Sequence, residues 1–457
     1  MARAKKEAAL TPEERLQAAL VPDWEWPHKL PENWCWTTVG AINQYVGISA
    51  DPTKAKNETF ELYSVPSSAD NYPEIVLGAD IGSTKQAVKK GDVLLCKINP
   101  RINRVWKVSK YTDHSLLASS EWIVVRNSRL ISNYLMWCFR SPYFRGYMLS
   151  NVSGVGGSLM RAQPKFVQGY PVPVPPLAEQ QRIVDRIESL FAKLDEAKEK
   201  AQAVVDSFET RKAAILHKAF TGELTAKWRE EHGVGMDSWR WIPLKKSGSW
   251  YGGGTPSMRR SEYWENGTLL WVTAKDMKSD LIEDTLMHTN MFGVENSSAN
   301  YIAQPAVLFV MRSGILRRTF PVCMVKKPFT VNQDIKALVP TDNIDLEYLF
   351  WGCKANEKRI LESCMKNGTT VESINSAALR DFEIPIAGSN EQIEIVRILD
   401  AFFAKEQQTK EAAEKVLDQI ELMKKSILAR AFRGELGTND PSEESAVELL
   451  KEIIRRG

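Results

Sequence analysis

The chain has 457 residues, of which 43% are hydrophobic and 26% charged, with a net charge of +3. This length allows two to four domains, the composition is that of an ordinary globular protein, and the charge alone indicates no nucleic acid. The six cysteines form no Cys-x-x-Cys pair, and neither an N-terminal apolar segment nor an apolar run of 18 residues is present. We therefore expect reduced thiols, no signal peptide, no membrane span and a cytoplasmic location.

The first part of the chain predicts a short extension followed by a globular block. Residues 1–28 contain a helix signal, with Thr11 as N-cap and Pro12 at the first helical position. Residues 29–176 form the first block. Strand-like runs occur at 92–96 and 121–125, and a helical run occurs at 134–139. The proline-rich stretch 170–176 that closes the block is expected to be an extended, stiff connector.

A long helix is predicted over residues 177–224. Apolar residues recur at alternating steps of four and three from Ile183 to Ile215, and only Arg211 interrupts them. This spacing is typical of a heptad seam, in which one helix packs along another. Gly222 lies where the end of the helix is expected, and residues 225–237 are read as a linker.

The second part of the chain repeats the first. Residues 238–388 form a second globular block, residues 389–436 a second long helix, and residues 437–457 a tail with a short helix. Residues 179–224 and 391–436 align without a gap at a constant offset of 212, with about 21 of the 46 positions identical. The second seam runs from Ile395 to Ile427, and Gly434 matches Gly222. A repeat separated by the length of a domain indicates a duplicated unit.

The predicted fold is α+β, with two globular blocks of mixed strands and helices joined by two long helices. If the helices pair antiparallel, as a coiled coil, a pseudo-twofold axis relates the two blocks. A parallel pair sets the blocks side by side, and the length of the chain allows both. Ordinary amphipathic helices within a larger core are a third reading.

Each block contains a basic loop after a strand-like run. A DNA reader needs cations for phosphates, and planar amide or guanidinium groups for base edges. Residues 97–107 contain no acidic residue, and the second loop follows the run 307–310. Asn332 and Gln333 could read adenine, although a structural hydrogen-bonding role is an open alternative, as is a solvated basic surface for the loops. The candidate DNA-binding residues are Lys97, Asn99, Arg101, Asn103, Arg104, Lys107, Arg312, Arg317, Arg318, Asn332 and Gln333.

Catalytic and cofactor motifs are mostly missing from the sequence. The glycine run 252–254 lacks the lysine of a phosphate loop, and Asp334 and Lys336 match only the end of a nuclease motif. The Asp-Pro-Pro-Tyr and Asn-Pro-Pro-Phe strings that adenine methyltransferases use do not occur, and the five histidines are scattered. We therefore expect no catalytic site, cofactor or metal site in this chain.

Several strings resemble a known family, the specificity subunits of type I DNA restriction–modification systems. They are Pro-Pro-Leu-Ala-Glu-Gln at 175–180, Phe-Thr-Gly-Glu-Leu-Thr-Ala-Lys-Trp-Arg at 220–229, Gly-Gly-Thr-Pro-Ser at 253–257, Val-Asn-Gln-Asp at 331–334 and Ala-Phe-Arg-Gly-Glu-Leu at 431–436. Their order and spacing carry the resemblance, which covers both halves of the chain. The second copy departs from the pattern at 387–392, Ala-Gly-Ser-Asn-Glu-Gln, where the prolines are missing.

The resemblance implies that the blocks are target-recognition domains and that the helices form an antiparallel spacer. Each domain would read one half of a split site in double-stranded DNA. The helices would set the gap and dock two methyltransferase subunits, which methylate adenine at N6, and a restriction and translocase subunit would complete the complex. The chain itself would be non-catalytic. The alternatives are a self-sufficient nuclease or methyltransferase, and a coiled-coil scaffold without a DNA role.

Overall fold

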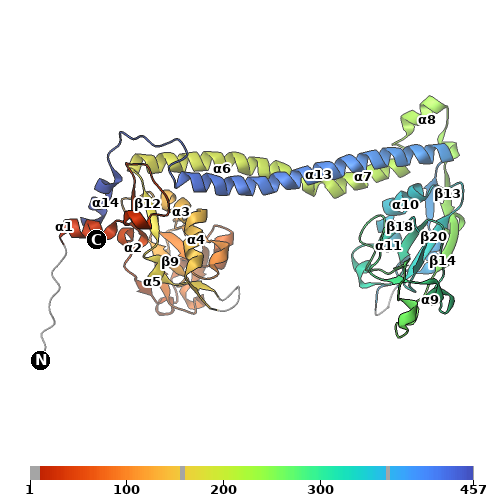
Figure 1. The fold of residues 1–457 in the computed structure, drawn as a ribbon, viewed down its shortest axis with the longest axis horizontal. Helices are drawn as coiled ribbons and strands as arrows, with labels where there is room; N and C mark the ends of the chain where they lie inside the picture. The colour runs from red at the N-terminus through yellow and green to blue at the C-terminus, as the bar shows by residue number, and fades with distance from the viewer. Residues whose placement is uncertain (1–10, 155–159, 367–370, 456–457) are drawn as a thin grey trace. The chain divides into compact units, whose positions relative to one another are not determined.

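The computed structural model describes residues 11–154, 160–366 and 371–455. The chain divides into two compact units (Figure 1). Unit 1 comprises residues 1–201 and 415–457, and unit 2 comprises residues 202–414. Each unit therefore contains one globular block together with parts of both long helices. None of the helices in the described ranges is long and apolar enough to cross a membrane.

Unit 1 is built on two small sheets. One has the strand order β7-β6-β9, and the other has the order β2-β5-β8-β3-β4, in which only β3 and β8 run parallel. Two short pairs, β1 with β12 and β10 with β11, complete the unit. The strands are β1 Cys35–Thr38, β2 Ser49–Ala50, β3 Thr59–Tyr63, β4 Glu74–Leu77, β5 Lys85–Ala87, β6 Val93–Cys96, β7 Val105–Lys107, β8 Ser115–Ala118, β9 Trp122–Val125, β10 Val152–Ser153, β11 Arg161–Ala162 and β12 Pro171–Val174.

Helices cover the core of unit 1. Thr11 caps α1 in a reciprocal capping box with Glu14, and Pro12 occupies the first turn, as the sequence indicates. The C-terminal helix α14 packs against α1. The helices are α1 Pro12–Ala19, α2 Val39–Ile42, α3 Ser132–Arg140, α4 Pro142–Ser150, α5 Pro164–Val167, most of α6 Leu177–Asp206, the last part of α13 Ser389–Ala431 and α14 Ala446–Arg455.

The proline-rich stretch before α6 is a buried strand. We expected an extended, stiff connector, but β12 pairs antiparallel with β1 and all four of its residues are buried. Two of its residues are prolines, which have no N–H to donate. Their carbonyls accept hydrogen bonds instead, from Tyr143 Oη to Pro171 O (2.7 Å) and from Tyr134 Oη to Pro173 O (2.9 Å).

Unit 2 repeats this plan with different sheet sizes. Its largest sheet has the order β14-β20-β17-β18 and is antiparallel throughout, and a second sheet has the order β16-β15-β19 with β15 and β19 parallel. β13 pairs with β21 as β1 does with β12. The strands are β13 Arg240–Pro243, β14 Gly248–Gly252, β15 Leu269–Val272, β16 His288–Thr289, β17 Ala306–Val310, β18 Val322–Val325, β19 Phe329–Val331, β20 Ile335–Pro340 and β21 Glu383–Ile386.

The helices of unit 2 include one that the sequence did not reveal. The segment expected to be a linker, 225–237, contains α8, which ends at Gly233 with a left-handed backbone (φ 64°). Its seven residues are too few for a clear apolar period. The helices are α7 Phe208–Phe220, α8 Ala226–His232, α9 Met291–Glu295, α10 Leu346–Ala355, α11 Glu357–Cys364, α12 Ser376–Asp381 and the first part of α13.

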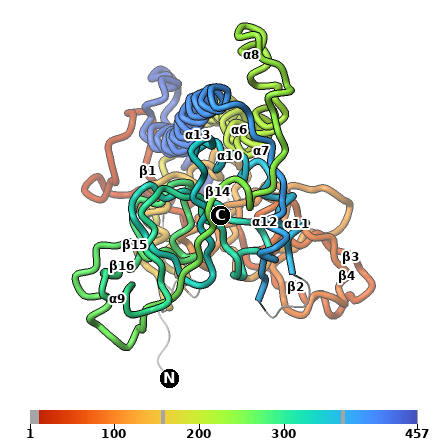
Figure 2. The backbone as a smooth tube through the Cα atoms, turned by 90° about the vertical axis from the view of Figure 1, so that its right-hand side faces the viewer, coloured from red at the N-terminus to blue at the C-terminus, as the bar shows by residue number. Residues whose placement is uncertain are grey.

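In each unit the long helices run antiparallel, and the views agree that α13 lies beside α6 and α7 (Figures 1 and 2). In unit 1, Lys198 of α6 pairs with Glu421 of α13 at 2.8 Å, and Asp195 pairs with Lys424. In unit 2, Arg211 of α7 pairs with Glu406 of α13 at 2.7 Å. Residue numbers thus rise along one helix as they fall along the other.

The first long helix is not continuous, because it is interrupted at Ser207 between α6 and α7. The Ser207 hydroxyl donates to Ala203 O (2.6 Å), a local bond that competes with regular helix geometry. Arg211, which interrupts the heptad seam, donates to Val204 O (3.2 Å) across the break. α13 has no such break, although Val416 and Met423 of its predicted seam are exposed.

The glutamine of the repeated Glu-Gln pair connects two backbone segments by hydrogen bonds in both units. Gln180 accepts from Ile131 N (3.0 Å) and donates to Pro175 O, and Gln392 accepts from Asp345 N (2.8 Å) and donates to Ala387 O. The missing prolines of the second copy therefore leave this contact intact.

The glutamates of the two pairs are buried and bind the segments that follow the opposite helices. Glu179 accepts from Thr438 Oγ1, and Glu391 accepts from Thr225 Oγ1, both at 2.6 Å. Burial raises the pKa of Glu179. Each globular block is thereby fixed to both long helices within its own unit.

Candidate nucleic-acid interface

The basic loop of unit 1 connects β6 to β7 and is held tightly by its backbone. Asn99 and Asn103 adopt left-handed conformations (φ 47° and 51°), which asparagine tolerates better than most residues. They flank the 3-10 turn Pro100–Ile102. Lys97 donates from its backbone N to Glu121 O (3.0 Å), and Asn99 donates to Met160 O (2.8 Å). These hydrogen bonds therefore hold the backbone of the loop in one conformation.

The side chains predicted to bind DNA do not all face solvent. Arg101 is exposed, and Lys97, Asn99 and Arg104 are half-buried. Asn103 donates to Arg140 O (3.2 Å), and the Lys107 ammonium binds Asn133 Oδ1 (2.5 Å). The last two are thus engaged within the unit.

The structure adds an arginine that the sequence did not suggest. Ile98 of the loop forms a bridge with Arg161 of β11, so Arg161 lies directly beside it. The Arg161 guanidinium pairs with Glu121 (Nε to Oε2, 3.3 Å). About 60 residues separate Arg161 from the loop, and local sequence gives no signal for such a contact.

The basic loop of unit 2 occupies the equivalent position after β17. Met311 donates from its backbone N to Asp334 O (2.7 Å), as Lys97 does to Glu121 O. Arg312 forms a bridge with Ser373, as Ile98 does with Arg161. The two loops therefore share their backbone anchors as well as their basic character.

The three predicted arginines of unit 2 have different surroundings. Arg312 Nε donates to Asp334 Oδ1 (2.8 Å), and Arg317 Nε donates to Glu372 Oε1 in the 3-10 turn Gly314–Arg317. The hydrogen bond from Arg317 lowers the pKa of Glu372. Arg318 lies at the edge of a neighbouring cleft.

Asn332 and Gln333 follow β19, and the sequence left open whether they read adenine or form structural hydrogen bonds. Asn332 is buried and its Oδ1 accepts from Asp334 N (3.1 Å), so it has a structural hydrogen-bonding role. Gln333 is exposed, accepts from Thr255 Oγ1 (2.9 Å) and donates to Asp334 Oδ2 (3.3 Å).

Gly253 allows this contact between distant strings. A Cβ atom on Gly253 would lie 1.8 Å from Val331 O and 2.8 Å from Val331 C. Only glycine at this position allows the two backbones to approach so closely. The Gly-Gly-Thr-Pro-Ser and Val-Asn-Gln-Asp strings thus meet in one place.

Comparison with known proteins finds one family to which this chain is similar. Residues 251–418 match the type I restriction modification DNA specificity domain. The EcoR124I/EcoR124II specificity subunit of Escherichia coli is 40% identical over 162 residues, which are 35% of this chain and 40% of that protein. The EcoKI specificity subunit of E. coli K12 is 24% identical over 72% of this chain and 73% of that protein. The chain is therefore similar to the specificity subunits of type I restriction–modification systems.

Two solved structures share the fold of this chain. One is a chain from a structure of a type I R-M system (TM-score 0.72, 22% identity), and the other is the HsdS subunit of Thermoanaerobacter tengcongensis (TM-score 0.63, 21% identity). Both alignments cover 90% of this chain and all of the other. The match to the EcoR124I/EcoR124II subunit, by contrast, spans about two fifths of that relative's length.

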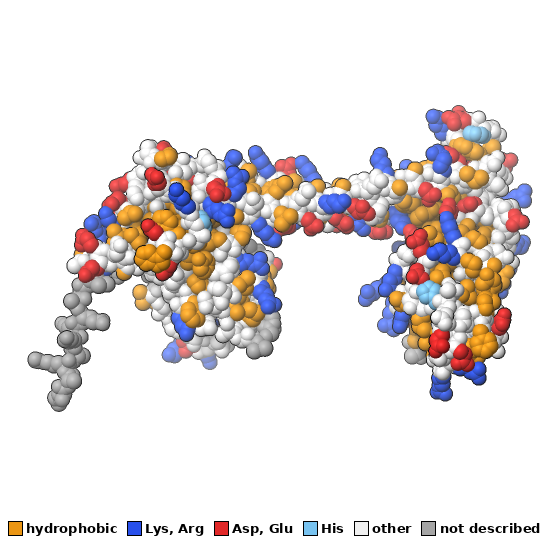
Figure 3. Space-filling view, viewed as in Figure 1, with side chains coloured by type: hydrophobic (Ala, Val, Ile, Leu, Met, Phe, Trp, Pro, Cys, Tyr) orange, Lys and Arg blue, Asp and Glu red, His pale blue; other side chains and the backbone are white. Residues whose placement is uncertain are grey.

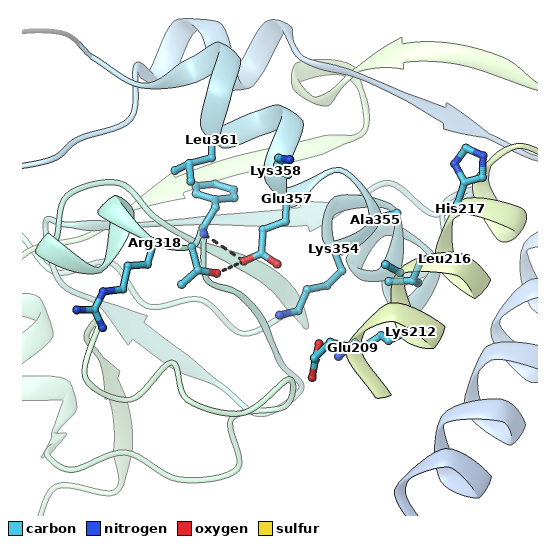
Figure 4. A pocket seen from close by; sticks show the side chains of 13 residues that line it. Glu209, Lys212, Leu216, His217, Arg318, Lys354, Ala355, Glu357, Lys358 and Leu361 are labelled. Atoms are coloured by element: carbon cyan, nitrogen blue, oxygen red, sulfur yellow. Dashed lines mark hydrogen bonds between the residues drawn. The ribbon is translucent and has the colours of Figure 1, made fainter. Parts of the chain in front are cut away.

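A cleft of about 580 Å³ adjoins the second loop, between α7, α10 and α11 (Figure 4). Lys212 and Lys354 are compensated there, because both pair with Asp280 (3.5 and 3.2 Å). Glu357 accepts from Thr319 and from Phe320 N, and Arg318 points away from α7 in Figure 4. The cleft therefore extends the basic surface through Arg318 and the exposed Lys358. Lys and Arg side chains also project from both units in Figure 3.

Across the described residues, no group of three or more His, Cys, Asp or Glu side chains could hold a metal ion. All six cysteines are buried, and burial raises the pKa of the Cys35 and Cys138 thiols to about 12. Such thiols are poor nucleophiles.

Proposed function

We propose that this chain is the DNA-recognition subunit of a type I restriction–modification complex and has no catalytic activity itself. Unit 1 would read one half of a bipartite duplex site through the loop 97–104 and Arg161. Unit 2 would read the other half through Arg312, Arg317, Arg318 and Gln333. The matched anchors of the two basic loops, in a chain similar to this family, carry the proposal.

The proposed partners follow from the family. Two methyltransferase subunits, acting at adenine N6, would dock on the chain, and restriction and translocase subunits would complete the complex. The chain would then supply sequence choice, and its partners would supply S-adenosylmethionine chemistry and cleavage. A cytoplasmic location is proposed on the same ground.

Selection from a duplex library with randomised positions tests the proposal. The full-length chain, with and without the methyltransferase subunits, should enrich two short sequences separated by a fixed gap. The chain alone should methylate and cleave nothing. Enrichment of no sequence in either condition, or methylation by the chain free of its partners, contradicts the proposal.

Substitution of the loops assigns the half-sites. Arg101→Ala should weaken selection of one half-sequence and Arg318→Ala should weaken the other, because the two residues lie in different units. A residue that contacts only phosphate should instead weaken binding to all sequences and lower the salt dependence of binding.

A further inference from the structure

Carboxylates lie beside the candidate arginines of both units, at a surface expected to bind a polyanion. Asp334 adjoins Arg312, Glu372 adjoins Arg317, and Glu121 adjoins Arg161. Each carboxylate repels DNA phosphates and so opposes binding. Exposed ion pairs contribute little to folding stability, and these arginine side chains are 42–69% exposed. Neither binding of phosphates nor stability therefore accounts for the acids.

The contact geometry gives the acids a different role. Among the described residues, the Arg312 guanidinium donates only through Nε, to Asp334 Oδ1. Arginine carries five N–H groups, so the outer N–H groups of both terminal nitrogens stay available as a fork. Guanine presents two acceptors, O6 and N7, to the major groove, and a bidentate arginine fits them. An acid at Nε fixes the plane of that fork without blocking it.

Asp334 is itself held on every side. Its backbone N donates to Asn332 Oδ1 (3.1 Å), its backbone O accepts from Met311 N (2.7 Å), and its Oδ2 accepts from Gln333 Nε2 (3.3 Å). Gln333 is in turn held by Thr255. An orienting group must be fixed before the ligand arrives, because ordering it on binding costs affinity.

The same arrangement recurs in unit 1. Glu121 accepts from Lys97 N through its backbone, as Asp334 does from Met311 N, and its carboxylate accepts from Arg161 Nε (3.3 Å) and Nη2 (3.5 Å). This side-on contact uses one N–H of Nη2 and leaves the outer N–H groups of both terminal nitrogens available. The carboxylates thus occupy equivalent backbone positions in two units whose local sequences differ. The two arginines come from different elements, because Arg161 lies in β11 and Arg312 lies in the loop after β17.

We infer that Asp334 and Glu121 are positioning residues that aim Arg312 and Arg161 at a guanine in each half-site. The inference rests on the proposed DNA-recognition function and adds the base that each unit reads. Glu372 gives Arg317 a further contact of the same kind.

Base preference in the full-length chain tests the role of Asp334. Wild type, Arg312→Lys, Asp334→Asn and the double variant select from the same randomised duplex library. Arg312→Lys keeps the charge but loses the fork. It should reduce the preference for guanine at one position, by roughly 5- to 150-fold. Asp334→Asn should relax the same position and no other, and the double variant should relax it no further than Arg312→Lys does.

Asp381→Asn is the matched control, because it breaks an exposed ion pair with Lys245 elsewhere in unit 2 (2.6 Å). It should leave every base preference unchanged. Thermal unfolding of all variants checks that they fold. If Asp334→Asn is unstable, Asp334→Glu takes its place. Because it keeps the carboxylate, it should retain part of the preference for guanine.

Three outcomes overturn the inference while the proposed function stands. In the first, Asp334→Asn keeps all base preferences and binds every sequence more tightly, so the acid only repels phosphate. In the second, Arg312→Lys keeps the guanine preference. In the third, Asp334→Asn relaxes a position that Arg312→Lys does not affect. If the wild-type chain selects no sequence, the proposed function itself fails.

Discussion

Phe220 and Phe432, which are 212 positions apart, have the same role in the two units. Phe220 is the last residue of α7, and Phe432 comes directly after the last residue of α13. The ring of each is buried in the core of a globular block. Phe220 packs against Tyr348 with ring centroids 5.1 Å apart, and Phe432 packs against Tyr134 at 5.4 Å. Gly222 and Gly434 then turn the chain with left-handed backbones (φ 83° and 74°). The repeated Ala-Phe-x-Gly-Glu-Leu string is therefore an anchor that ends a helix.

Phe432→Ala should destabilise unit 1 by about 3–5 kcal/mol, because it removes a fully buried ring and leaves a cavity. Hydrogen exchange measured by mass spectrometry reports each unit separately. Amides of unit 1 should lose protection, and those of unit 2 should not. Met423→Ala on the same helix is the control, since Met423 is 50% exposed. Equal protection in the two variants would contradict the anchoring role.

His28 makes the stability of unit 1 depend on pH. Its ring packs edge-on against Trp36 and Tyr143, and its Nε2 lies 2.9 Å from Phe432 O. Burial lowers the pKa of His28 below its ordinary value of 6.5. The folded state therefore binds the proton less readily than the unfolded state does, and stability falls as pH falls through this range.

The His28→Gln variant isolates this contribution. The difference in unfolding free energy of unit 1, wild type minus variant, should decrease from about pH 7.5 to about pH 5.5. Hydrogen exchange at several pH values, corrected for the intrinsic rates, measures it. A difference that is constant with pH would show that His28 keeps its ordinary pKa.

At the scale of elements, the interruption between α6 and α7 lies beside an ion pair that joins α7 to α13. Arg211 and Glu406 replace apolar seam residues, and both are partly buried (33% and 17% exposed). Removing one partner leaves a buried charge, whereas replacing both with apolar groups does not.

Arg211→Leu should therefore destabilise unit 2 by about 1–3 kcal/mol, and the double variant with Glu406→Leu should recover most of the loss. Hydrogen exchange of unit 2 in the four proteins of the double-mutant cycle measures the coupling. Additive effects of the two substitutions would show that the pair is not coupled.

Local patterns in the sequence predicted much of the fold and less of the interface. The strands β6 and β9, helix α3 and the long helices follow from apolar periods. β12 was read as a connector because two prolines obscure a strand whose partner, β1, is more than 130 residues away. The sequence did not indicate Arg161 or Thr255 as site residues for the same reason. Arg161 contacts Ile98, and Thr255 contacts Gln333, and both contacts join residues that are far apart in the sequence. The basic loops stand out in the sequence because their charges are contiguous, and their role in binding DNA stays a prediction.

At the scale of the molecule, the duplication makes each unit depend on both halves of the chain. α13 contributes residues 389–414 to unit 2 and 415–431 to unit 1 as one unbroken helix. Base-reading candidates lie in the globular blocks, and the helices contain few. This separation predicts that half-site sequences and the gap between them can be changed independently.

Lengthening both helices tests that separation. Lys198 opposes Glu421, so an insertion after Ala201 of α6 is matched by one after Asp418 of α13. Seven residues in each helix add about 10 Å, close to three base-pair steps, and turn the distal part by only about 20°. The gap selected from a randomised duplex library should widen, and the two half-sequences should stay the same.

Two-residue insertions at the same places are the control. They rotate the downstream seam by about 200°, which exposes apolar residues such as Ile420, so this variant should aggregate or lose binding. If the seven-residue variant binds with an unchanged gap, the helices do not set the spacing. If it selects altered half-sequences, the reading of bases is not confined to the globular blocks, and the independence of spacing and sequence fails with it.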